Sequence, residues 1–239
     1  GPGRIFFAST FFDNSGTGNY IVICENDGTP YYYRKVPRSN LGTGEFKVQD
    51  NGLLSFYQYL NSDEGFYITM DHDFADVDTF RAGHGYRTDS HEMLLLDNGH
   101  ALVVAEEDRT MDLSGVVSGG KTEARVIGNH IQEVDSDGNV YWEWRCWDHL
   151  DVADTYNNLT QNRIDYIHLN SIAIDYDGNY IVSLKHFFEV CKIDPVSGDF
   201  IWRFGGKNNE FDIDDEYHIA DQHHAQPVPG KPNNYTIYD

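Results

Sequence analysis

The sequence has little positive charge and little cysteine. Its 239 residues contain 17 Lys and Arg against 39 Asp and Glu, which gives a formal net charge of −22. Such a charge repels phosphate backbones and anionic lipid surfaces, and this argues against nucleic acid as a partner. The three cysteines, Cys24, Cys146 and Cys191, have no Cys-x-x-Cys spacing and cannot all pair within one chain. The sequence therefore contains no zinc or redox motif.

Long apolar runs and helical periodicity are also missing. No run approaches the roughly 18–20 apolar residues that cross a bilayer, and the first residues do not resemble a signal peptide. No stretch longer than about ten residues keeps apolar residues at the spacing of a helix. Hydrophobic residues nevertheless make up 40% of the chain and aromatic residues 14%. This is enough to form a core, so we expect a folded domain without a membrane-spanning segment.

Short runs rich in Val, Ile, Tyr, Phe and Trp recur between Gly, Asn and Asp residues, which predicts an all-β fold. A glycine turn followed four residues later by an aromatic residue occurs three times: Gly28 with Tyr32, Gly138 with Trp142, and Gly198 with Trp202. Two of these units carry an earlier hairpin at Asn98-Gly99 or Asp177-Gly178. For these hairpins we expect two-residue turns in which both central residues have positive φ.

Four antiparallel strands in repeats of roughly 40–60 residues are typical of the blades of a β-propeller. The sequence predicts a half unit near 19–37, units near 46–82, 91–147 and 167–206, and the beginning of another at 222–239. We expect residues 1–239 to form one β-propeller domain of about four to five blades, part of a longer chain. Segments 107–128 and 207–221 are expected to be long loops.

Three histidines recur at matching places in these units. Because the first strand of a blade is innermost, a residue at its start lies near the central channel. His91 and His168 are expected at that place in consecutive units, and His223 opens the next unit. Lys185 is expected to end the second strand of the unit that begins with His168. Together these side chains would form a positive pocket for an anion, with a histidine as nucleophile or general acid and base.

A metal site and a purely structural role are the alternatives for the histidines. Histidine is a common metal ligand, but His218, His223 and His224 have no carboxylate at a recognised spacing. The segments 135–138 and 175–178 lack the bidentate glutamate of a calcium loop. We therefore expect no metal and no cofactor, while a structural role for the histidines stays open.

Many short segments of residues 85–239 resemble the arylsulfate sulfotransferase family in order and spacing. They are Asp89-Ser90-His91-Glu92, Leu96-Asp97-Asn98-Gly99, His168-Leu169-Asn170-Ser171-Ile172, Asp177-Gly178-Asn179-Tyr180, Ser183-Leu184-Lys185, Lys192-Ile193-Asp194, Ser197-Gly198, Ile201-Trp202, Gly205-Gly206-Lys207 and Gln222-His223. Residues 1–84 resemble the family only in the rhythm of their turns.

The resemblance implies a six-bladed propeller, secreted or periplasmic, that moves a sulfuryl group from an aryl sulfate to a phenol without a nucleotide donor. In the family a channel histidine becomes transiently sulfated, and by the Gln-His pattern this residue is His223. The two other channel histidines correspond to His91 and His168, and an arginine of the family corresponds to Lys185. Asn170 matches a residue that lines the substrate pocket.

Some features keep a second interpretation open. His224 follows the predicted nucleophile directly, so it is the second candidate for that role and a candidate substrate contact. Because a lysine replaces the family's arginine, the chain could instead be a catalytically impaired propeller that serves as an extracellular binding or structural module. Two sequons, Asn158-Leu159-Thr160 and Asn234-Tyr235-Thr236, favour an extracellular or periplasmic glycoprotein. Small aryl sulfates and phenols are the expected partners, and a homo-oligomer stays open.

Overall fold

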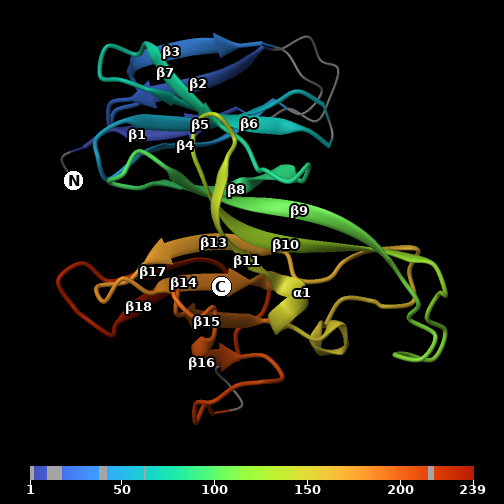
Figure 1. The fold of residues 1–239 in the computed structure, drawn as a ribbon. Coiled ribbons are helices and arrows are strands. Elements are labelled where there is room, and N and C mark those ends of the chain that lie inside the picture. Colours follow the sequence, from blue (N-terminus) through green and yellow to red (C-terminus); the bar gives the residue numbers. More distant parts are fainter. Residues whose placement is uncertain (1–2, 10–17, 38–41, 62, 215–217) are drawn as a thin grey trace. The chain divides into compact units, whose positions relative to one another are not determined.

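The computed structural model describes residues 3–9, 18–37, 42–61, 63–214 and 218–239. The described chain consists of β-strands with one short α-helix and two short 3₁₀ helices, so the predicted all-β fold is confirmed. It divides into two compact units (Figure 1). The first comprises residues 1–105 and 132–142, and the second comprises 106–131 and 143–239.

Two antiparallel sheets lie wholly in the first unit, and consecutive strands pair in both. One sheet contains β1 (Ile5–Ala8), β2 (Asn19–Cys24) and β3 (Pro30–Val36). The other contains β4 (Thr43–Val48), β5 (Leu54–Tyr59), β6 (Gly65–Met70) and β7 (Asp76–Phe80). Their core includes Ile21, Phe56 and Met70, all fully buried.

The division between the units runs through the third sheet. Its strands are β8 (Arg87–Leu95), β9 (Ala101–Met111), β10 (Ala124–Val134) and β11 (Val140–Arg145), again in consecutive order. A short strand, β12 (Arg163–Asp165), pairs with β10 in parallel. The short helices follow β11 and comprise α1 (Cys146–His149) and η1 (Val152–Asp154).

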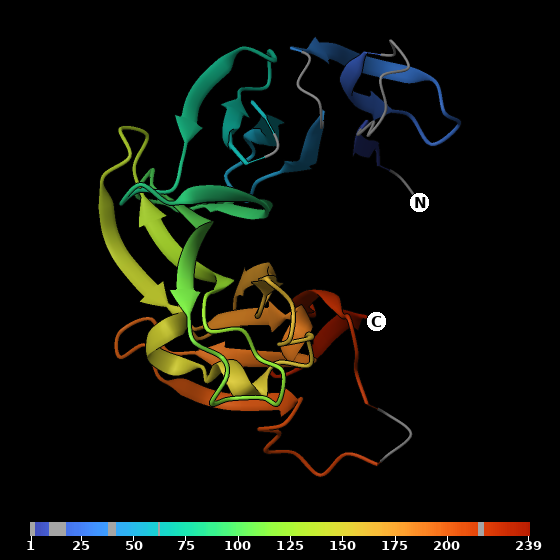
Figure 2. The ribbon, with the colours of Figure 1, turned by 90° about the vertical axis from the view of Figure 1, so that its right-hand side faces the viewer.

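The second unit contains the last four-stranded sheet and a two-stranded one (Figures 1 and 2). The four strands are β13 (Leu169–Ile174), β14 (Tyr180–Leu184), β15 (Glu189–Ile193) and β16 (Phe200–Gly205), with η2 (Lys185–Phe187) between β14 and β15. The pair is β17 (His223–Pro227) and β18 (Tyr235–Tyr238), of which β17 lies beside β13 and β14. The sheets therefore have the architecture of propeller blades, at the positions that the sequence predicts.

The repeated glycine turns differ from the expected type. Glycines 28, 52, 99, 138 and 178 have φ between 84° and 86°, and in each case the preceding residue is not in the positive-φ region. Each glycine N–H donates to the carbonyl three residues earlier, as Gly99 does to Leu96 at 3.0 Å. The prediction that both central residues have positive φ is wrong, because the preceding side chain forms an Asx turn. Asn98 Oδ1, for example, accepts the N–H of His100 at 2.9 Å.

The prediction of a long loop over 107–128 is also wrong. Strand β9 continues to Met111 and β10 begins at Ala124, so that only residues 112–123 connect them. Charged residues of this segment are paired across these strands, where Arg125 Nε donates to Asp108 Oδ2 at 2.9 Å. The described residues of the second predicted loop, 207–221, contain neither helix nor strand.

No disulfide bond joins the strands of the described residues. All three cysteines are buried free thiols. Burial raises the pKa of the Cys191 thiol well above its usual value, so this residue behaves as a core side chain. In the described part of the chain, no helix has the length and apolar character needed to cross a bilayer.

Candidate functional site

Strands β13 and β14 bring His168 and Lys185 together. His168 directly precedes β13, and the N–H of Lys185 donates to the His168 carbonyl at 3.0 Å, which extends the ladder by one pair beyond Leu169 and Leu184. The sequence predicted that Lys185 ends β14. In the structure Lys185 is instead the first residue of η2. The chain turns there because Phe188 adopts a left-handed conformation with φ 53°.

Gln222 ties the start of β17, and hence His223, to the same two strands. The Gln222 side chain is fully buried. Its Nε2 donates to Ser183 Oγ at 3.2 Å, to the Leu184 carbonyl at 3.2 Å and to the Glu189 carbonyl at 2.9 Å. These bonds fix Gln222, the residue before His223, and so hold the backbone at the predicted nucleophile in place.

Asn170 completes this attachment. Its side chain is 5% exposed, and Nδ2 donates to the Gln222 carbonyl at 2.7 Å. The Asn170 Oδ1 and Gln222 Oε1 atoms are buried and accept no hydrogen bond. Asn170 thus supports β17, and its remaining oxygen is an acceptor that could meet a ligand donor. The predicted substrate contact of Asn170 stays a prediction.

The neighbouring histidines of β17 have different surroundings. His223 is half-buried, whereas His224 is exposed and has a left-handed φ of 51°. The pairing of β17 with β18 shifts its register between His223 and Gln226, which places the irregularity at these residues. His223 is the better candidate for chemistry within the protein, because His224 faces solvent.

The Lys185 ammonium group is only loosely paired. Its Nζ lies 4.0 Å from Asp221 Oδ1, and the Asp221 side chain is 68% exposed. An ion pair of this length between solvated groups contributes little. The ammonium group can therefore serve an anionic ligand at small cost.

His168 is held by a carboxylate that the sequence analysis did not single out. Asp165, the last residue of β12, places Oδ2 2.5 Å from His168 Nδ1. Burial would raise the pKa of the Asp165 carboxyl, but the hydrogen bond and nearby positive charges outweigh it and the pKa is lowered. His168 itself has a left-handed φ of 50°, a strained conformation for a residue other than glycine.

His186 adjoins this pair. Its Nδ1 lies 2.6 Å from the Asp165 carbonyl oxygen, and its ring centroid is 4.9 Å from that of His168. Burial lowers the pKa of His186, which favours the neutral ring. A stacked aromatic pair, Tyr156 and Phe188, lies next to it, because the Tyr156 N–H donates to the His186 carbonyl at 2.8 Å.

Asp165, His168 and His186 are also the group of described residues that could hold a metal ion. Their ligand atoms lie within 4.8 Å of one another. Two imidazoles and a carboxylate suit a transition metal. In the structure the Asp165 carboxylate accepts from the His168 ring, and the Asp165 backbone carbonyl accepts from the His186 ring.

His91 lies in the first unit, inside β8 and not at its start. The strand begins four residues earlier than expected, at Arg87. Asp89 Oδ1 is 2.7 Å from His91 Nδ1 and accepts the His91 N–H at 2.7 Å. A carboxylate on Nδ1 is thus common to His91 and His168. The structure describes each unit by itself, so the convergence of His91 with the other histidines in one channel stays a prediction.

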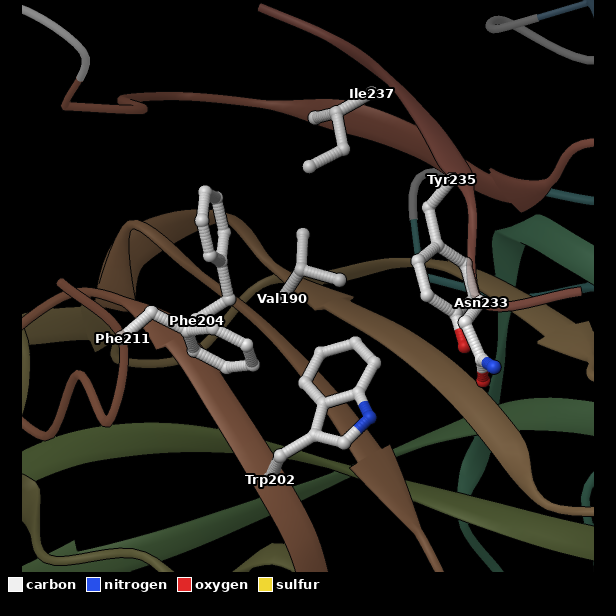
Figure 3. A pocket seen from close by; sticks show the side chains of 7 residues that line it. All are labelled: Val190, Trp202, Phe204, Phe211, Asn233, Tyr235 and Ile237. Carbon is white, nitrogen blue, oxygen red and sulfur yellow. The ribbon is translucent and has the colours of Figure 1, made fainter. Parts of the chain in front are cut away.

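The apolar pocket of the second unit contains none of these residues (Figure 3). It has a volume of about 380 Å³ and is lined by Val190, Trp202, Phe204, Phe211, Asn233, Tyr235 and Ile237. Several of these side chains pack on the buried core of β13, β14, β15 and β17. The pocket is a gap in the packing between two sheets and has none of the charged groups that sulfuryl chemistry requires.

The carboxylates of Asp89 and Asp165, which the sequence analysis missed, each have a signal in the sequence. Asp89 stands two residues before His91, and Asp165 three residues before His168. An acid shortly before each of these two histidines could have been noticed as part of the repeat. His186 had no such signal, because only η2 turns it toward Asp165.

Comparison with solved structures gives distant neighbours. A protein of unknown function from Bacteroides caccae has 16% identity and a TM-score of 0.45, with 85% of this chain and 59% of that chain covered. An inactive virginiamycin B lyase variant from Staphylococcus aureus with quinupristin has 12% identity and a TM-score of 0.43, with 84% and 58% covered. A streptogramin B lyase has 11% identity and a TM-score of 0.42, with 91% and 71% covered. The chain thus spans less than two thirds of the length of the first two.

A family comparison covers nearly the whole chain, whereas no curated protein matches it. The model of the arylsulfotransferase (ASST) family matches residues 16–238. The match includes the sheets β2–β7, which lie before the segments that carry the resemblance in sequence. The chain belongs to the arylsulfotransferase (ASST) family.

Proposed function

We propose that this protein transfers a sulfuryl group from an aryl sulfate to a phenolic acceptor through a sulfohistidine on His223. The observation that carries the proposal is the attachment of His223, through Gln222, to the strand ends that hold His168 and Lys185. Membership of the arylsulfotransferase family supports the reaction class.

The side chains fit the charge changes of sulfuryl transfer. Like phosphoryl transfer, this reaction has a loose transition state with charge on its oxygens, so positioned cations and donors carry the catalysis. Neutral His223 attacks sulfur in line with the departing aryl oxygen, while Lys185 holds the sulfonate oxygens. Protonated His91 or His168 donates to the departing phenolate and later takes the proton of the acceptor phenol. The exposed Tyr156 ring, stacked on Phe188, is a candidate surface for the aryl group.

The test is turnover by the full chain with 4-nitrophenyl sulfate and a phenol. We expect release of nitrophenolate, and an intact-mass increase of one sulfuryl group when the acceptor is left out. His223→Ala should abolish both signals, whereas the control His224→Ala should retain them. A sulfuryl group found on His224, or turnover by His223→Ala, would contradict the assignment.

A binding module is the second candidate, favoured by one observation. Lys185 replaces the arginine of the family, and lysine lacks the planar two-point grip on an oxyanion. A chain that binds aryl sulfates without turnover would support this candidate. The exposed sequon residues Asn158 and Asn234 are compatible with an extracellular or periplasmic location, which we propose for either function.

A further inference from the structure

We infer that Asp165 is a positioning residue of the reaction: its carboxylate fixes the ring of His168 through Nδ1, which makes His168, and not His91, the general acid and base. This inference rests on the proposed function and decides between the two histidines that it leaves open. It concerns contacts within the second unit only.

The backbone of Asp165 is held rigidly. Asp165 pairs with Ile127 of β10, and the next N–H, of Tyr166, donates to the Ile127 carbonyl at 3.2 Å. The Asp165 carbonyl accepts from Asn157 Nδ2 at 2.8 Å and lies 2.6 Å from His186 Nδ1. These backbone contacts fix the position of the Asp165 carboxylate independently of His168. A rigid support of this kind is what an orienting residue requires.

The carboxylate charge is directed at His168. Its Oδ2 contacts His168 Nδ1 at 2.5 Å, while Oδ1 is buried and accepts no hydrogen bond. A carboxylate bonded to one nitrogen of an imidazole fixes the orientation of the ring and determines which ring nitrogen carries the proton. Asp89 differs, because its Oδ1 also accepts the backbone N–H of His91 and closes a local turn. Part of the Asp89 charge therefore stabilises the backbone instead of the ring.

The His168 backbone is strained in a way that preserves this contact. The left-handed conformation is unfavourable for a residue with a Cβ atom. It is held by two hydrogen bonds from η2, Lys185 N–H to the His168 carbonyl and His186 N–H to the Ile167 carbonyl, both 3.0 Å. The fold thus keeps the His168 ring against Asp165 at a cost in stability, which is typical of functional residues.

The proton balance follows from this arrangement. As the S–N bond to His223 forms and the S–O bond breaks, the imidazolium of His168 gives its Nε2 proton to the aryl oxygen. In the second half-reaction, neutral His168 takes the proton of the acceptor phenol at Nε2. The phenol oxygen attacks sulfur as the S–N bond to His223 breaks. Asp165 keeps its charge throughout and holds the proton on Nδ1.

The first test compares leaving groups. Removing a general acid costs about 10²–10⁴ in rate when the leaving group needs a proton. We expect Asp165→Asn to lower kcat at least about 10-fold with phenyl sulfate, a poor leaving group, and far less with 4-nitrophenyl sulfate. The matched control Asp89→Asn should show no such dependence. Equal losses for both substrates, or a dependence in the control alone, would overturn the inference.

The second test is a double-mutant cycle. If Asp165 acts through His168, Asp165→Asn should cost nothing further in a His168→Gln background, whereas Asp89→Asn should still add its own effect. If the rate losses of Asp165→Asn and His168→Gln multiply in the double variant, the two residues act independently and Asp165 has a merely structural role. Full loss of activity on adding EDTA would instead identify the cluster as a metal site and overturn the inference.

A third measurement does not need activity. In ¹⁵N NMR of the full chain, His168 should carry its proton on Nδ1 at a pH where the ring is neutral, and Asp165→Asn should change this tautomer. An inactive wild-type protein with this signature would contradict the proposed function but support the Asp165–His168 pair. A neutral His168 ring protonated on Nε2 would overturn the pair even in an active protein.

Discussion

At the scale of single residues, Lys185 is the position at which the resemblance implies an arginine in the family. The Lys185 backbone pairs with His168, and its ammonium group makes only a loose contact with Asp221. A guanidinium group would add two-point contact with the sulfonate oxygens. Under the proposed function, we therefore expect this position to affect how tightly the donor is held more than whether the reaction can occur.

We expect Lys185→Ala to lower kcat/KM for aryl sulfates about 10–100-fold, because a hydrogen bond to a charged group contributes about 1.5–3 kcal/mol. Lys185→Arg should retain turnover and lower KM, since the planar group restores two-point contact. Steady-state kinetics with 4-nitrophenyl sulfate measure both. The control Asp221→Asn removes the carboxylate that lies near Lys185, so KM should either stay the same or decrease. Wild-type kinetics in Lys185→Ala would remove this residue from the site.

At the scale of elements, Glu107 connects β9, β10 and the start of α1. Its carboxylate lies 3.0 Å from His130 Nε2 and accepts from Trp147 Nε1 at 2.7 Å, Arg145 at 3.2 Å and Arg109 at 3.3 Å. Burial would raise the pKa of Glu107, but the bonds from His130, Trp147 and Arg109 outweigh it and lower the pKa to about 2. This network explains why a charged segment forms strand instead of the loop expected from the sequence.

We expect Glu107→Gln to lower the free energy of unfolding at pH 7 by about 1–3 kcal/mol, since the fully buried His130 ring loses a charged partner. The folded-state pKa is below the ordinary value near 4.5, so the contribution is complete above that value and disappears as pH falls toward about 2. Urea denaturation at several pH values measures the difference. A constant difference between pH 7 and pH 2 would contradict the charge-based explanation.

A second network joins sheets in the second unit. Lys192 Nζ donates to Asp175 Oδ2 at 2.5 Å and to Asp177 Oδ2 at 2.7 Å, and Tyr235 of β18 donates to the same Asp175 oxygen at 2.6 Å. In the sequence the segment 175–178 faintly resembled a calcium loop without its glutamate. In the structure it is a turn whose carboxylates accept hydrogen bonds from Lys192.

At the scale of the whole molecule, the charge of −22 dominates. Self-repulsion of like charges destabilises the folded state, and salt screens it as the Debye length falls from about 30 Å at 0.01 M to about 10 Å at 0.1 M. The same net charge repels anionic ligands, so an anion site on this protein needs a local cation such as Lys185.

We expect the melting temperature at pH 7 to rise by a few degrees between about 0.01 M and 0.3 M NaCl, because screening relieves this repulsion. Differential scanning calorimetry measures the change, and a neutral osmolyte at equal osmolality is the control. A melting temperature that falls with NaCl would show that attractive ion pairs, and not the net charge, govern stability.

The sequence by itself determined the all-β fold, the positions of the blade-like sheets and the protein family. These depend on local patterns: alternation, glycine turns at a fixed spacing, and motifs such as Gln222-His223. Even the carboxylate of Asp89 stood beside His91 in the sequence.

The tertiary structure alone decided which side chains act together. Asp165, His168 and His186 come from β12, the start of β13 and η2, and only the pairing of β12 with β10 and of β13 with β14 brings them within reach. The pairing of β9 with β10, and of β10 with β11, likewise brings His130 and Arg145 to Glu107. Contacts between elements depend on which strands pair and where the chain turns, so no local pattern in the sequence could specify them.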